Sequence, residues 1–136
     1  MLRYYIDYES GVLVTEVMHS VTAQDVLNHI QAIAGNAEAH QLHKELIDVR
    51  GSGIGLSFSE MFTVVEADQN RCGERERYIA IMVESLLAYG VARMFTQLQG
   101  NKRYHIKIFR ARDEALQWLN NINLSQQAEQ LDGTNA

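Results

Sequence analysis

The first twenty residues carry two runs in which apolar positions recur at the spacing of β-strands. Apolar or aromatic residues occupy the even positions from Leu2 to Tyr8, and a second β-rich run covers residues 12–18. A period of two is typical of a strand with one buried face. The turn-forming segment Glu9-Ser10-Gly11 joins the two runs, so we predict a β-hairpin at the start of the chain.

Three later stretches repeat their apolar residues every three or four positions, which is typical of amphipathic helices. Each follows a residue that favours a helix N-cap, namely Thr22, Ser57 and Ser85. Asp25 and Glu60 lie three positions after the first two caps and complete the pattern of a capping box. We predict helices over 22–34, from 58 to about 68, and over 85–100, the last with a buried stripe of Leu87, Val91, Met94, Phe95 and Leu98.

Short apolar runs over 44–49, 78–83 and 104–108 complete the pattern as strands, and a final helix is predicted over 113–122. The element order is therefore β-β-α-β-α-β-α-β-α. Strands that alternate with helices predict an α/β fold in which helices pack on a five-stranded mixed sheet, mostly parallel with one antiparallel strand. We expect one domain over residues 1–122 and a polar, flexible tail over 123–136.

Five short motifs follow one another along this pattern. They are Gly11-Val12-Leu13-Val14, Val21-Thr22-x-x-Asp25, Leu46-Ile47-Asp48-Val49-Arg50, Tyr89-Gly90-x-Ala92-Arg93-Met94 and Ala115-Leu116-x-Trp118-Leu119. In order and spacing they resemble the SpoIIAA-like family of small bacterial domains, of the STAS/SEC14 type, over residues 2–122. The resemblance implies a STAS-like fold, shared by anti-sigma-factor antagonists and related to lipid-carrying SEC14 proteins, and it brings no established enzyme activity.

The sequence departs from this pattern where anti-sigma-factor antagonists are phosphorylated. Those proteins carry an Asp-Ser-Ser/Gly-Gly motif after the third strand, whereas this chain reads Asp48-Val49-Arg50-Gly51-Ser52-Gly53. No carboxylate directly precedes the serine. Ser52 and Ser57 are therefore poor matches to a phosphorylation site, and a partner switch controlled by a kinase is not expected.

The charge is distributed unevenly along the chain. The net charge is −5, yet residues 71–112 alone carry nine bases and three acids. The overall acidity argues against nucleic acid as a partner. Two interpretations of the basic block stay open. In the first, Arg71, Arg75 and Arg77 line a solvated connection, and Arg110 and Arg112 pair with nearby acids. In the second, the block forms an anion-facing patch for a lipid headgroup or an acidic partner.

No part of the sequence has the pattern of a leader peptide or of a membrane span, because no apolar run approaches about 20 residues. Cys72, the single cysteine, cannot form an intramolecular disulfide. We expect a cytoplasmic protein, peripheral at most to the inner face of the membrane.

The candidate metal-binding, catalytic and phosphate-binding motifs each lack residues that their function requires. His40 and His43 lack further ligands for a metal, and Cys72 lacks a recognisable base. The segment Gly51-x-Gly53-x-Gly55 lacks the Lys-Ser/Thr of a P-loop. We therefore expect no cofactor, no metal site and no enzyme activity.

Large apolar residues follow those glycines, where an ordinary loop is polar. Two interpretations stay open: they pack on the sheet, or the glycines Gly51, Gly53 and Gly55 form a hinge that lets the helix from 58 swing away and expose an apolar cleft. The candidate ligand-binding residues are Ile54, Leu56, Phe58, Met61, Phe62, Tyr89, Gly90 and Arg93.

The leading hypothesis is a non-enzymatic carrier or sensor of a small apolar or amphipathic, lipid-like ligand, with peripheral membrane association. The alternative is a protein–protein interaction module, either a homodimer or a regulatory partner of the anti-sigma-factor-antagonist type.

Overall fold

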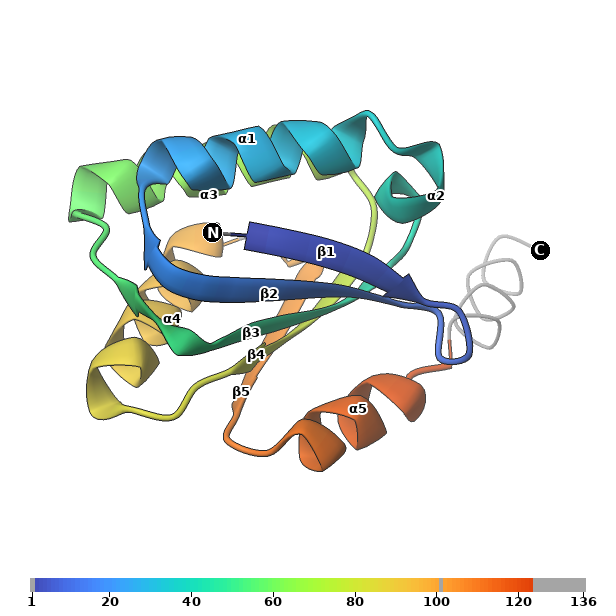
Figure 1. The fold of residues 1–136 in the computed structure, drawn as a ribbon. Coiled ribbons are helices and arrows are strands. Elements are labelled where there is room, and N and C mark those ends of the chain that lie inside the picture. The colour runs from blue at the N-terminus through green and yellow to red at the C-terminus, as the bar shows by residue number, and fades with distance from the viewer. Residues whose placement is uncertain (1, 101, 124–136) are drawn as a thin grey trace.

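The computed structural model describes residues 2–100 and 102–123, and in this part of the chain five strands form one sheet in the order β1-β2-β3-β4-β5 (Figure 1). The strands are β1 (Leu2–Asp7), β2 (Val12–Val21), β3 (Lys44–Ile54), β4 (Arg77–Met82) and β5 (Tyr104–Phe109). β1 pairs antiparallel with β2, and every later pairing is parallel. This arrangement confirms the predicted mixed sheet with one antiparallel strand.

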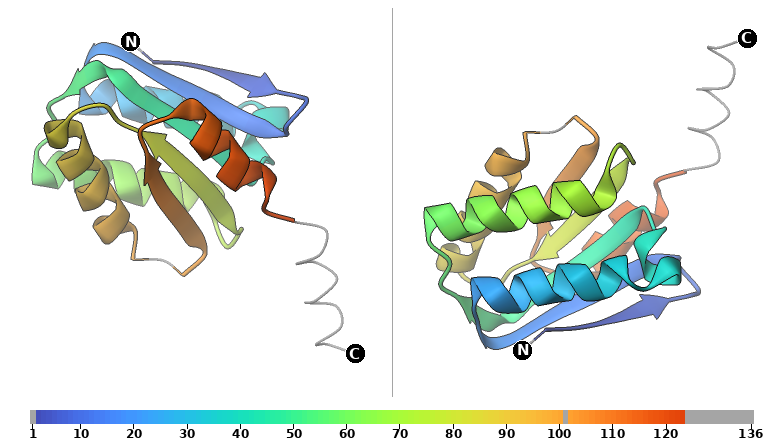
Figure 2. Two further views of the ribbon diagram at one scale, coloured as in Figure 1. Left: turned by 90° about the horizontal axis from the view of Figure 1, so that it is seen from below. Right: turned by 90° about the horizontal axis from the view of Figure 1, so that it is seen from above.

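Helices cover both faces of the sheet. They are α1 (Ala23–Ala34), α2 (Ala37–His40), α3 (Phe58–Cys72), α4 (Leu86–Gln99) and α5 (Arg112–Asn120). α1, α3 and α4 lie on one face and α5 on the other, as the views from above and below show (Figure 2). The predicted element order is confirmed, with the short α2 as an addition. Of the predicted tail over 123–136, residues 124–136 lie outside the described residues.

The predicted helix starts are confirmed by their caps. Thr22 and Ser57 each form a complete capping box, with Asp25 and Glu60 respectively. Ser85 Oγ accepts a hydrogen bond from the Ala88 amide at 3.1 Å. Local hydrogen bonds of this kind satisfy amides that have no partner within the helix, so a few residues of sequence suffice to define a helix start.

The expected ends of α3, β2 and β3 were wrong. α3 continues four residues past 68 to Cys72, where Gly73 ends it with φ 61°. β3 continues through residues 51–54, which we expected to be a loop, because β2 also extends to Val21 and pairs with it from Met18↔Gly51 to Val21↔Ile54. A register shift between Glu16 and Met18 accommodates this pairing. Backbone hydrogen bonds to a neighbouring strand thus override the glycine-rich composition.

The alternation of strand residues buries apolar side chains on both faces of the sheet. Val12, Val14, Leu46 and the β4 residues Tyr78, Ala80 and Met82 pack with Ala115 and Leu119 of α5. Val17, Val49, Ile79 and Ile81 face the opposite layer, where Ala92 and Phe95 of α4 meet them. Every residue of β4 is buried, as its nearly continuous apolar sequence predicted.

Candidate ligand-binding cavity

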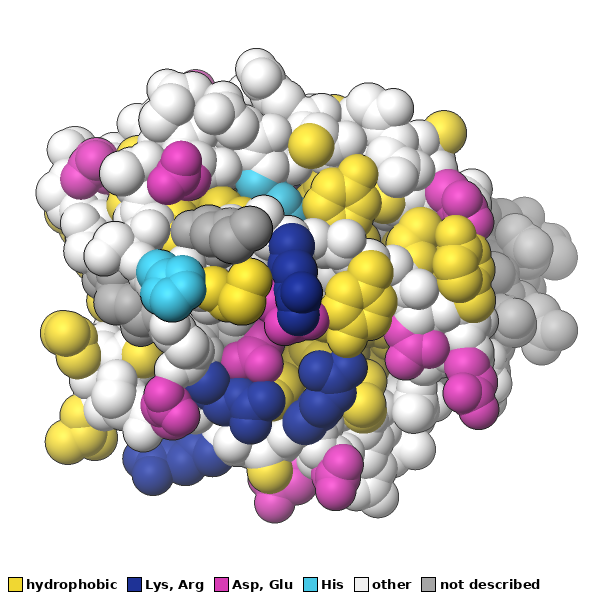
Figure 3. Space-filling view, viewed as in Figure 1, with side chains coloured by type: hydrophobic (Ala, Val, Ile, Leu, Met, Phe, Trp, Pro, Cys, Tyr) yellow, Lys and Arg dark blue, Asp and Glu magenta, His cyan; other side chains and the backbone are white. Residues whose placement is uncertain are grey.

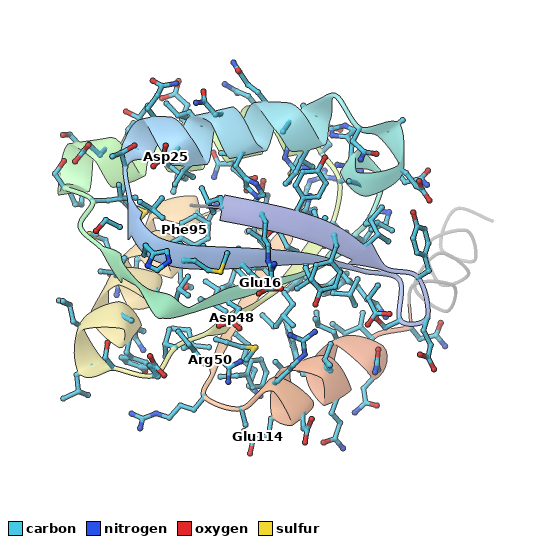
Figure 4. The ribbon with its side chains drawn as sticks, viewed as in Figure 1. Glu16, Asp25, Asp48, Arg50, Phe95 and Glu114 are labelled. Atoms are coloured by element: carbon cyan, nitrogen blue, oxygen red, sulfur yellow. The ribbon has the colours of Figure 1, made fainter. Side chains whose placement is uncertain are left out.

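A cavity of about 130 Å³ lies between the sheet and the layer formed by α1, α3 and α4. Its wall is almost entirely apolar. Contributing side chains include Val26 and Ile30 of α1, Leu56 before α3, Met61 and Val64 of α3, Ala88, Ala92 and Phe95 of α4, and Ile47 and Val49 of β3. Figure 4 shows Phe95 on the α1 side of the sheet. The cavity thus separates three helices from the strands that they cover.

The cavity wall also contains one polar group of side chains, which lies toward the carboxyl end of α3. Its members are Thr15, His29, Glu45, Asp68 and Arg71. Thr15 Oγ1 donates to Glu45 Oε2 at 3.2 Å and lies 3.3 Å from His29 Nε2. Glu45 also accepts a hydrogen bond from Arg77 at 2.6 Å. These side chains give the apolar cavity a charged and hydrogen-bonding boundary.

Arg71 and Arg77 are buried, so the expectation that they line a solvated connection was wrong. The Arg71 side chain is 3% exposed and the Arg77 side chain 0%. Arg71 belongs to the last turn of α3, which is longer than expected, and Arg77 opens β4 on the same face as Ile79. Arg112 donates to the Tyr5 hydroxyl at 3.0 Å, in place of the carboxylate we expected.

Burial alters the titration of the groups around these arginines. It lowers the pKa of His29, which favours the neutral imidazole. The pKa of His40 is lowered first by burial and then by the charges of Arg75, Arg71 and Arg77. Burial also raises the pKa of the Cys72 thiol, whose Sγ lies 3.1 Å from Arg77 Nη1. Arg75 Nε also donates to the Cys72 carbonyl at 3.3 Å, so Arg71, Arg75 and Arg77 lie in one neighbourhood.

The structure places some of the candidate ligand-binding residues in the cavity wall and others outside it. Leu56 and Met61 line the cavity. Phe58 and Phe62 are 64% and 53% exposed, and Tyr89, Gly90 and Arg93 are exposed residues of α4 outside the cavity wall. Ile54 ends β3. Of the proposed hinge glycines, Gly51 and Gly53 are paired with β2, and Gly55 follows the strand.

The serine candidates occupy two different environments. Ser52 pairs with His19 in the ladder between β2 and β3. Ser57 is the exposed N-cap of α3, and its Oγ accepts a hydrogen bond from the Glu60 amide.

Sequence reasoning missed two exposed leucines at the start of α4. Leu86 and Leu87 are 81% and 76% exposed, so the expected burial of Leu87 was wrong. Both precede the first α4 residues in the cavity wall, Ala88 and Val91. With Phe58 and Phe62 of α3 they form what we call the apolar tips of these helices, which lie at the same end of the molecule (Figure 1). Two adjacent leucines directly after an N-cap were the available signal.

A second hollow, of about 340 Å³, lies on the α5 side of β2 and β3 and has a charged wall. Figure 4 shows Glu16, Asp48 and Arg50 there, and in Figure 3 acidic and basic side chains mix on this part of the surface. Arg50 pairs with Asp48 at 3.0 Å, and Arg3 pairs with Glu16 at 3.0 Å. Burial opposes ionisation of Asp48, but hydrogen bonds from Arg50 lower its pKa overall. The charges of this hollow are largely satisfied by one another.

Within residues 2–100 and 102–123, no three His, Cys, Asp or Glu side chains are grouped so that they form a metal site. None of the helices described has the length and apolar character required to cross a bilayer.

The sheet and its covering helices define a small α/β domain. The chain is similar to the crystal structure of an uncharacterized protein of the DUF3478 family with a SpoIIAA-like fold, from Shewanella loihica PV-4. The TM-score is 0.60 at 17% sequence identity, over 87% of this chain and 93% of that one. The fold that the motifs implied is thereby confirmed. No protein-family model and no curated protein matches the sequence.

Proposed function

We propose that this protein is a non-enzymatic carrier or sensor of a small apolar or amphipathic ligand. The observation that carries the proposal is the apolar cavity of about 130 Å³. Protein interiors are close-packed, and apolar side chains that face an unfilled space lose packing contacts at a cost in stability. A ligand that fills the space recovers part of this cost, which gives an apolar group a reason to bind there.

The volume limits what enters the cavity in this conformation. A cavity of about 150 Å³ accommodates benzene, whereas sites for larger ligands usually span about 300–1,000 Å³. A ring or a single alkyl chain fits the present space, and a bulkier lipid requires outward movement of α3 or α4. Gly55 lies between the end of β3 and the N-cap Ser57, and it is where we place the hinge for such a movement.

The apolar tips supply a route by which the ligand reaches the cavity. Phe58, Phe62, Leu86 and Leu87 are more than half exposed, which is unusual for side chains of this size at the start of two helices. Leu56, Met61 and Ala88 of the cavity wall adjoin them in sequence. Insertion of the tips into a bilayer surface would bring the cavity next to the acyl chains, so we propose peripheral membrane association.

Two measurements on protein purified from cells test the proposal. Native mass spectrometry and solvent extraction are expected to reveal a bound amphiphile, and the protein is expected to float with anionic vesicles. The double variant Leu86→Ser/Leu87→Ser should lose flotation and keep its fold, because both side chains are exposed. Tyr8→Ser is the matched control, since Tyr8 is 73% exposed but lies at the β1–β2 turn. The proposal would be contradicted if the purified protein contained no ligand and did not float with the vesicles.

The same apolar tips favour a second candidate, a protein–protein interaction module that uses them to contact a partner or a second copy. The SpoIIAA-like fold is consistent with this function. A stoichiometric protein partner, retained without lipid and lost in Leu86→Ser/Leu87→Ser, would favour the module over the carrier.

A further inference from the structure

We propose that the ligand is a carboxylate with a single alkyl chain, bound with its head group inward at Arg71 and its chain along the apolar wall toward Leu56. This inference rests on the proposed function and assigns the chemical class and the orientation of the ligand.

Arg71 is the first reason. Its side chain lines the cavity and is 3% exposed. Nη2 pairs with Asp68 Oδ1 at 3.2 Å, whereas Nε and Nη1 are buried and have no hydrogen-bond partner among the described residues. A buried guanidinium nitrogen without an acceptor is costly, and native structures rarely leave two in one side chain. A ligand oxygen beside Arg71 would satisfy this unmet donor capacity.

The position of Arg71 in the cavity is the second reason. Met61 and Arg71 both line it and stand ten residues apart in α3, which corresponds to about 15 Å along the helix. Between them Val64 and, across the layer, Phe95 and Ile79 supply apolar wall. An elongated space with a guanidinium toward one end and apolar side chains along the rest matches an extended chain with one anionic head.

The local charge is the third reason. Arg71 adjoins Cys72 in sequence, Arg75 Nε donates to the Cys72 carbonyl at 3.3 Å, and Arg77 Nη1 lies 3.1 Å from the Cys72 sulfur. Two carboxylates, Asp68 and Glu45, balance two of the three positive charges through their ion pairs. His29 adds no charge near neutral pH because burial lowers its pKa. Glu45, Asp68, Arg71 and Arg77 therefore sum to no net charge, and Arg75, which lies outside the cavity wall, adds a positive charge beside them.

A carboxylate suits this balance of charges better than a phosphate does. A carboxylate carries a single negative charge, whereas a phosphate monoester carries about −1.5 to −2 at neutral pH and would overcompensate next to Asp68 and Glu45. The neutral Thr15 hydroxyl and His29 ring are further polar groups of the wall. The head-group chemistry therefore favours a monoanion.

The test compares octanoate, 1-octanol and octyl phosphate by calorimetric titration of the full chain. Octanoate is expected to bind more tightly than both other compounds. The variant Asp68→Asn/Arg71→Gln removes the guanidinium without leaving Asp68 as a buried charge, and should weaken octanoate binding at least about tenfold while 1-octanol is unaffected. Arg93→Gln, an exposed arginine of α4, is the matched control and should leave all three affinities unchanged.

A second readout locates the head group independently of affinity. In NMR spectra of the octanoate complex, the α-methylene protons should show contacts to the His29 ring and the terminal methyl group to Leu56 or Met61. The reverse contacts, equal affinity for octanoate and 1-octanol, or tighter binding of octyl phosphate would overturn the inference and leave the apolar carrier intact. Failure of every octyl compound to bind would contradict the proposed function itself.

Discussion

Arg77 Nη2 donates a hydrogen bond to Glu45 Oε1 over 2.6 Å, and the two side chains are 0% and 7% exposed. The residues lie on the neighbouring strands β4 and β3, near the end of the sheet at which the parallel strands begin. Thr15 donates to the second oxygen of Glu45. This buried pair holds the polar boundary of the cavity in place, because each charge is costly to leave without the other.

Loss of one partner should therefore destabilise the protein strongly. Glu45→Gln leaves the Arg77 charge buried without its counter-ion and is expected to lower the free energy of unfolding by about 3 kcal/mol or more. The double variant Glu45→Leu/Arg77→Met should recover most of this loss, because both charges disappear together. Urea denaturation measures the free energy of unfolding of the single and the double variant. Equal losses in the single and double variants would show that the pairing is not what stabilises the fold.

Filling the cavity should block the ligand without a penalty in stability. Ala92 of α4 lines the cavity and is 5% exposed, so Ala92→Leu has room for its added carbons. Ala115 of α5 is 0% exposed in the opposite core, where the same substitution should overpack and cost about 1–3 kcal/mol. Thermal unfolding compares the stability of the Ala92→Leu and Ala115→Leu variants. Ligand retention should fall for Ala92→Leu. An equally large loss of stability at both positions would argue that the cavity is closed in solution.

Two glycines with open surroundings should respond oppositely to substitution by alanine. Neither Gly73 nor Gly90 has a heavy atom within 4 Å of an added Cβ. Gly90 lies inside α4, and Gly90→Ala should stabilise the protein by about 0.5–1 kcal/mol. Gly73 has φ 61° and ψ −130°, so Gly73→Ala should destabilise it. Destabilisation by Gly90→Ala instead would reveal that a partner or ligand packs closely against α4 in solution.

Stability should fall as the pH drops through the ordinary pKa of histidine. Burial places the pKa of His29 below its ordinary value of 6.5 in the folded chain. Below that pH, His29 binds a proton in the unfolded chain but stays neutral in the folded chain, so the free energy of unfolding decreases. His40 acts in the same direction, again through burial. Urea midpoints between about pH 7.5 and about pH 5.5 should show a shallower decline in His29→Gln than in the unsubstituted chain. An identical decline in both chains would exclude His29 as the cause.

The sequence by itself determined the secondary structure wherever the signal was local. The capping boxes at Thr22 and Ser57 and the cap at Ser85 are satisfied within three residues, and a short turn joins the two strands of the hairpin. The nearly continuous apolar run over 78–83 likewise predicted a central strand. The order of these elements and their connections then led to the mixed sheet, because chain connectivity permits few other arrangements.

Only the tertiary structure decided which side chains are buried together. Arg77 meets Glu45 from 32 positions away, Arg71 joins a cavity wall built from three helices, and residues 51–54 become strand because β2 lies beside them. Leu87 fits the helical period of a buried stripe and is nevertheless 76% exposed, since nothing among the described residues covers the start of α4. Periodicity reports which face a side chain occupies, whereas burial depends on what distant segments place opposite that face.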